Sequence, residues 1–104
     1  MSKLFIDAFQ HEVAEEKAEA LGRQGRRLEH AVERMRRHDE VRGEASRREQ
    51  LVWDLAERVE AFVVQREACG LRDSRHVLEF YSVPREALAR VGDKLPRLGA
   101  PQSR

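Results

Sequence analysis

The sequence predicts an all-α protein: a long, coiled-coil-like antiparallel helical hairpin with two short C-terminal helices packing at its base. Three observations predict this fold. Residues 2–42 contain no proline, residues 46–69 carry a regular apolar seam, and Gly70 and Pro84 punctuate the chain that follows. A chain of 104 residues forms one modest core, so we expect a single domain over residues 1–92.

The composition narrows the class of protein and its location. Charged residues make up 38% of the chain and the net charge is +1, so no global field attracts nucleic acid or a membrane. Asp7 and His11 interrupt the apolar residues of the N-terminus, which predicts neither a signal peptide nor a membrane span. The single cysteine excludes an internal disulfide and points to a reducing compartment. We therefore expect a cytoplasmic protein.

The helix over residues 46–69 has the clearest boundary signals. Ser46 and Glu49 form an S-x-x-E capping box at its start. Gly70 can adopt the left-handed conformation that ends a helix, and Leu71 supplies the apolar contact of a Schellman motif. Between these signals, a seam in steps of three and four comprises Val52, Leu55, Val59, Phe62, Arg66 and Cys69. A helix with this seam needs a partner helix.

The partner is the helix over residues 2–42, which would be about 60 Å long at about 1.5 Å per residue. Gly22 and Gly25 together cost it about 2 kcal/mol of helix propensity, so two helices broken at these glycines are the alternative. A second seam in the same steps comprises Ala18, Leu21, Gly25, Leu28, Val32 and Met35.

One antiparallel register aligns the two seams. The residue numbers of every pair add up to 87: Met35–Val52, Val32–Leu55, Leu28–Val59, Gly25–Phe62, Leu21–Arg66 and Ala18–Cys69. Gly25 then makes room for the Phe62 ring. The Leu21 layer fits least, and we expect the stem of Arg66 to lie over Leu21 with its charged end in water. The register also places two flanking pairs side by side, Arg36 with Glu49 and Gln24 with Gln65.

The remaining chain predicts two short helices over residues 74–81 and 84–91, with Asp73 or Ser74 as the first cap and Pro84 opening the second helix. We expect two aromatic pairs to meet and close the base of the hairpin: Phe5/Phe9 and Phe80/Tyr81. Residues 93–104 contain two prolines and few apolar residues, which predicts a flexible tail.

The helix over residues 46–69 has more apolar surface than one hairpin uses. Trp53 and Val64 lie nearly opposite its seam, and Ala56 and Val63 widen the seam towards them. These four residues are the candidate protein interface, unless the C-terminal helices or the N-terminus cover them. Residues 1–20 carry a net charge of −3 and residues 23–48 carry +4, so two copies of the first helix running antiparallel would attract each other. We expect a homodimer, and a protein partner is also possible.

Two basic regions suggest nucleic-acid contact as the alternative. Residues 77–91, VLEFYSVPREALARV, resemble the second half of a helix-turn-helix, which would present Arg85 and Arg90 to DNA. The hairpin turn carries further arginines that could bind phosphates: Arg34, Arg36, Arg37, Arg42, Arg47 and Arg48. The alternative function is therefore a small DNA-associated regulator.

Signals for catalysis are weak. The four histidines are scattered, and His11 with Glu15 has the spacing of only two metal ligands. Cys69 lies at a helix C-terminus, where the dipole disfavours a thiolate. We expect no catalytic, metal or cofactor site. The function predicted first is a non-enzymatic oligomerising scaffold or protein–protein interaction module.

Overall fold

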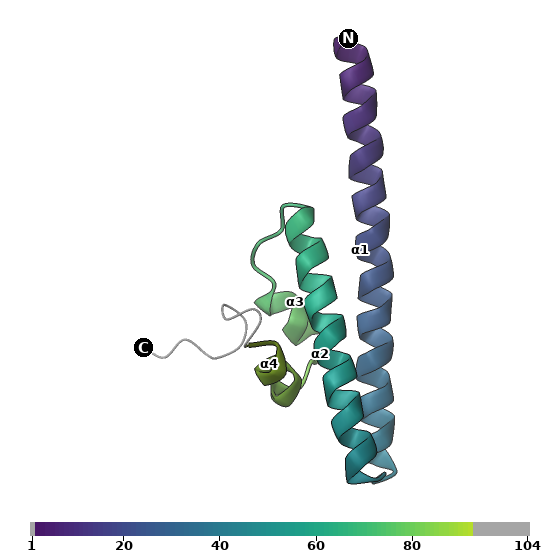
Figure 1. Cartoon of the computed structure of the whole chain (residues 1–104), viewed down its shortest axis with the longest axis vertical. Helices are drawn as coiled ribbons and strands as arrows, with labels where there is room; N and C mark the ends of the chain where they lie inside the picture. Colours follow the sequence, from purple (N-terminus) through teal and green to yellow (C-terminus); the bar gives the residue numbers. More distant parts are fainter. Residues whose placement is uncertain (1, 93–104) are drawn as a thin grey trace, which may run out of the picture.

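The computed structural model describes residues 2–92, and this part of the chain is helical with no strand. Its helices are α1 (Lys3–Glu40), α2 (Ala45–Ala68), α3 (Arg75–Phe80) and α4 (Arg85–Gly92). The long α1 and α2 run antiparallel as a hairpin, and the two short helices lie beside α2 (Figure 1). The all-α hairpin is therefore confirmed, and the predicted helix bounds agree to within two residues. The predicted tail, residues 93–104, lies outside the described residues.

The first helix is continuous through both glycines. Gly25 is buried, and a Cβ built there would lie 3.5 Å from Cε1 of Phe62 and 3.2 Å from the hydroxyl oxygen of Tyr81. Packing of these rings against the glycine compensates for its low helix propensity. The alternative of two helices broken at Gly22 and Gly25 is wrong.

The predicted register is confirmed in the middle of the seam and towards its open end. Gly25 faces Phe62 in the middle of the hairpin. Towards the open end, the Sγ atom of Cys69 lies 3.6 Å from the carbonyl oxygen of Lys17, beside its predicted partner Ala18. The core joins this seam to the short helices, and its buried members are Leu28, Ala31, Met35, Val52, Leu55, Ala56, Val59, Phe62, Val63, Leu78, Ala87 and Val91.

Three polar side chains of the hairpin have partners that the register did not predict. The guanidinium of Arg66, expected in water, donates to Ser74 Oγ and the Asp73 carbonyl, both at 2.8 Å. Arg36 binds carboxylates of its own helix, Glu33 and Glu40, and does not pair with Glu49. Gln65 donates to the Lys17 carbonyl at 3.4 Å, and not to the side chain of Gln24. In each case the side chain binds a polar group other than the expected one.

The helix ends follow the predicted pattern at the end of α2 but not at its start. Gly70 has φ +86°, and the amides of Gly70 and Leu71 donate to the carbonyls of Glu67 and Arg66, each at 2.9 Å, which is the Schellman motif. At the start the N-cap residue is Glu44, and its side chain makes no capping hydrogen bond. The predicted capping box is wrong because the N-cap is Glu44, which places Ser46 inside the first turn, and the Glu49 carboxylate binds Arg90 of α4.

The short helices do not close the base of the hairpin. Leu78 of α3 and both Ala87 and Val91 of α4 are buried in the core beside α2. The ring of Tyr81 packs edge-on against Phe62, with centroids 5.7 Å apart.

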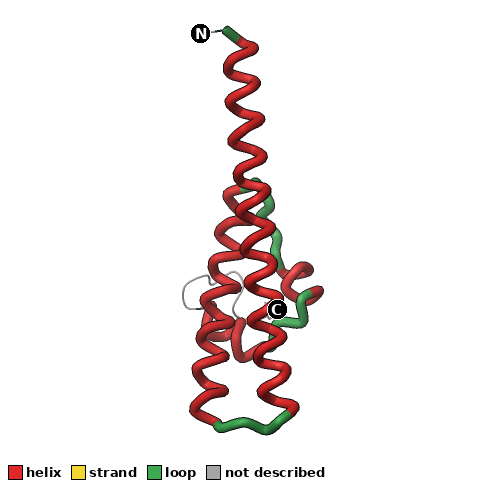
Figure 2. Tube along the Cα trace, turned by 90° about the vertical axis from the view of Figure 1, so that its right-hand side faces the viewer, coloured by secondary structure: helices red, strands yellow, loops and turns green. Residues whose placement is uncertain are grey.

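The predicted meeting of Phe5 and Phe9 with Phe80 and Tyr81 is therefore wrong. Phe5 is 58% exposed and Phe9 is 60% exposed, and Phe80 is exposed on α3. The first turns of α1 project beyond the end of α2, as the two views of the chain show (Figures 1 and 2).

Candidate interaction surfaces

Trp53 lies at the contact between α2 and α4. Its indole N–H donates to Glu49 Oε2 at 2.9 Å. The guanidinium of Arg90 donates to both oxygens of the same carboxylate at 2.9 and 3.0 Å, and its carbon lies 5.1 Å from the centre of the Trp53 ring. The hydrogen bonds from Arg90, and then that from Trp53, lower the pKa of Glu49. Trp53 is thus half-exposed and held by α4 on one side.

A second ion-pair cluster ties α4 to the hairpin turn. Arg48, near the start of α2, donates to Glu86 of α4 at 2.6 and 2.7 Å and to Asp39 of α1 at 2.9 Å. These hydrogen bonds lower the pKa of both carboxyl groups, Glu86 and Asp39. Three helices therefore meet at one arginine.

The four residues of the predicted protein interface do not share one surface. Val64 is exposed and Trp53 is half-exposed, whereas Ala56 and Val63 are buried in the core. Ala56 and Val63 are therefore covered within the chain. What is left at the surface is Trp53 and Val64.

The two arginines of the predicted nucleic-acid contact also separate. Arg85 is exposed at the start of α4, whereas Arg90 is partly buried and paired with Glu49 inside the chain. A DNA-reading helix presents its polar groups together on a protruding face. The described residues do not present Arg85 and Arg90 in this way.

Carboxylates offset much of the positive charge at the hairpin turn. Arg36 and Arg37 bind Glu33, and Arg48 binds Asp39 and Glu86. The hydrogen bond from Arg36, with help from Arg37, lowers the pKa of Glu33 to about 2. Phosphate groups would have to compete with these carboxylates.

A larger exposed surface is the projecting half of α1. Every residue from 2 to 19 is exposed, including several large apolar side chains: Leu4, Phe5, Ile6, Phe9 and Val13. The sequence predicted contact of Phe5 and Phe9 with Phe80 and Tyr81. The heptad spacing already indicated that Phe5 and Phe9 do not continue the hairpin seam. Steps of seven back from Ala18 and Leu21 reach His11 and Ala14 and miss both phenylalanines.

Comparison with known proteins places the chain in a family. A family model described as "Family of unknown function (DUF6665)" matches residues 4–97, which is most of the chain. The chain belongs to this family. No curated protein and no solved structure matches this DUF6665 chain.

The described part of this DUF6665 chain lacks a cluster of metal ligands. Within residues 2–92, no group of three His, Cys, Asp or Glu side chains is arranged to hold a metal ion. His11 and Glu15 are 3.8 Å apart on the exposed half of α1. None of the helices described is long and apolar enough to cross a membrane.

Proposed function

We propose that this protein is an association module that works by helix–helix contact and forms a homodimer through the projecting half of α1. The observation that carries the proposal is the exposure of Phe5 and Phe9 on a helix that continues well past its partner α2. A single helix in water is only marginally stable, so a second helix along this segment would stabilise it.

The spacing of the apolar side chains supports a helical partner. Phe5, Phe9 and Val13 follow one another in steps of four, and Ile6 adjoins them, so they form one ridge along α1. Burying a phenylalanine side chain contributes about 1.5–3 kcal/mol. Contiguous exposed apolar ridges of this kind are typical of interaction sites.

The other candidate surfaces have less support as binding sites. The face around Trp53 has lost Ala56 and Val63 to the core and is partly covered by Arg90. The pairing of Arg90 with Glu49 counts against the DNA-associated regulator. Neither observation favours a second function over the association module.

The test is the association state of the chain by sedimentation velocity over a range of concentrations. We expect a dimer for the natural sequence and a folded monomer for the double variant Phe5→Ser/Phe9→Ser. Loss of two buried phenylalanines should raise the dissociation constant at least about 100-fold. Circular dichroism checks that the hairpin is still helical.

Val64→Ser is the matched control, since it also removes an exposed apolar side chain and should leave the dimer unchanged. Dissociation by Val64→Ser or Trp53→Ser, with no effect of the phenylalanine variant, would move the contact to α2. A natural chain that stays monomeric at every concentration would overturn the proposal.

A further inference from the structure

One stripe of side chains runs along the face of α1 that points away from α2. Each residue of the stripe between positions 16 and 33 lies two residues before a residue of the hairpin seam. Two residues correspond to about 200° around a helix, so the stripe and the seam lie on opposite faces. The steps alternate between four and three without a break. The stripe comprises Phe5, Phe9, Glu12, Glu16, Glu19, Arg23, Arg26, His30, Glu33 and Arg37. All of these are exposed except Glu33, which is half-buried.

The order of chemistry along this stripe makes it complementary to itself. Two phenylalanines come first, then three glutamates, then two arginines and a histidine, and last Glu33 and Arg37. Building on the proposed self-association through α1, we infer that a second copy lies antiparallel along this stripe. The twofold axis then crosses α1 at the level of Leu21. The residue numbers of every facing pair then add up to 42: Phe5–Arg37, Phe9–Glu33, Glu12–His30, Glu16–Arg26 and Glu19–Arg23.

Charge selects this orientation over the parallel one. In the antiparallel pair Glu16 and Glu19 face arginines, and Glu12 faces His30. In a parallel, in-register pair each glutamate would face its own copy and each arginine likewise, which is repulsive. Facing charges at an exposed interface contribute mainly orientation and specificity, so the affinity comes from burial of Phe9 against Phe80 and Tyr81, which lie beside Glu33.

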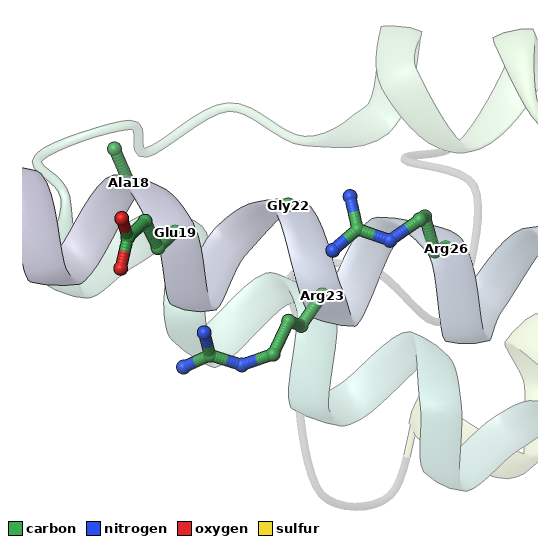
Figure 3. Close-up of a pocket in the computed structure, with 5 residues that line it drawn as sticks. All are labelled: Ala18, Glu19, Gly22, Arg23 and Arg26. Atoms are coloured by element: carbon green, nitrogen blue, oxygen red, sulfur yellow. The ribbon is translucent and has the colours of Figure 1, made fainter.

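The surface near the twofold axis allows a close approach of two helices. A shallow hollow there is lined by Ala18 and Gly22 together with Glu19, Arg23 and Arg26 (Figure 3). Gly22, which has no side chain, lets a second backbone come near, whereas Ala18 belongs to the seam that faces α2. Glu19 and Arg23 are the charged pair closest to the axis, so they would meet across it.

The ends of the stripe would meet aromatic surface. Phe9 of one copy lies opposite Glu33 of the other, and Glu33 lines a depression between α1 and the end of α3. The same depression is lined by Phe80 and Tyr81, and Phe80 is 81% exposed. The contact between the N-terminal and C-terminal aromatic residues, absent within one chain, is thus available between two copies.

Disulfide trapping tests the register, on a Cys69→Ser background that removes the natural thiol. One chain carries Glu12→Cys and a second carries His30→Cys. In the antiparallel pair these positions face each other, whereas two copies of residue 12 are about 27 Å apart along the helices. We expect a disulfide-linked dimer when the two chains are mixed and none from either chain alone, measured by non-reducing electrophoresis and intact mass.

Arg23→Cys, mixed with the Glu12→Cys chain, is the matched control and should not cross-link, because these positions are out of register. Cross-linking of the Glu12→Cys chain with itself would show a parallel pair. Preferential cross-linking to the Arg23→Cys chain would show another register. Either result in a chain that sediments as a dimer would overturn this inference and leave the proposed function standing. Monomeric sedimentation without any cross-link would overturn both.

Discussion

Gly25 lies where two aromatic side chains converge on α1. The Phe62 ring and the Tyr81 hydroxyl leave space for a hydrogen atom but little more, since a Cβ would come within 3.2 Å of the hydroxyl oxygen. Gly22, one turn earlier, has only the flexible end of Arg26 near it, at 3.5 Å. Two glycines of the same helix therefore have different reasons to be tolerated.

This difference predicts opposite effects on stability. Gly25→Leu should lower the free energy of unfolding by about 1–3 kcal/mol, because the added side chain overpacks a filled core. Gly22→Ala should raise it by up to about 1 kcal/mol, because alanine has the higher helix propensity. Urea unfolding followed by circular dichroism measures both. Equal effects of the two substitutions would mean that Gly25 does not face Phe62.

At the scale of the elements, α4 is a short helix that is stabilised largely by contacts with the other helices. Its apolar anchors are Ala87 and Val91, and its ends are fixed by the pairs Glu86–Arg48 and Arg90–Glu49. A helix of eight residues does not persist alone in water. The docking of α4 therefore depends on its buried apolar side chains and, in smaller part, on ionised carboxylates.

Acid should release α4 before the hairpin unfolds. Arg48 lowers the pKa of Glu86 and Asp39, and Arg90 lowers that of Glu49. The folded pKa values thus lie below the ordinary values, 4.5 for Glu and 3.8 for Asp. The stabilisation is fully present above those ordinary values and is lost as the pH falls below them towards the folded values.

Trp53 is the only tryptophan of the chain and packs against Arg90, so its fluorescence reports this contact. We expect its emission to be constant from neutral pH down to about 5 and to change below about 4, while the helical circular dichroism of the hairpin persists. Glu49→Gln should show the acid-like emission already at neutral pH, whereas Glu57→Gln, elsewhere on α2, should behave as the natural chain. Simultaneous loss of both signals would contradict a separate release of α4.

At the scale of the whole molecule, α1 presents two different faces. The seam through Leu28 and Met35 holds α2, and the stripe from Phe5 to Arg37 on the other face is open. The charges along the open stripe set how a second copy should respond to salt.

Salt should weaken the proposed dimer. Attraction between glutamates and arginines on exposed faces is screened as the Debye length falls from about 10 Å at 0.1 M to about 3 Å at 1 M. The dissociation constant from sedimentation should therefore rise with sodium chloride. A parallel pair brings like charges together and would tighten, and a purely apolar contact would not weaken, so either trend would contradict the antiparallel pairing.

Much of the hairpin could be predicted because its signals are local or depend on size. The steps of three and four, together with the small Gly25 opposite the large Phe62, select one register of two helices. The turn conformation at Gly70 follows from its missing side chain. The interface prediction was less complete, because Ala56 and Val63 look the same in sequence whether a second chain or α4 covers them.

The sequence by itself determined the helices, their bounds to within two residues, and the alignment of α1 with α2. Helical periodicity can be read from residues close together in the chain, and the volumes of the seam residues then select one alignment. Only the tertiary structure decided where α3 and α4 dock, which arginine binds which carboxylate, and that the first turns of α1 are exposed. The physical reason is that the sequence allows many equivalent ion pairs. With 20 basic and 19 acidic side chains, spacing allows many ion pairs of equal chemistry, and only the distances between packed helices select Arg48 for Glu86 and Arg90 for Glu49.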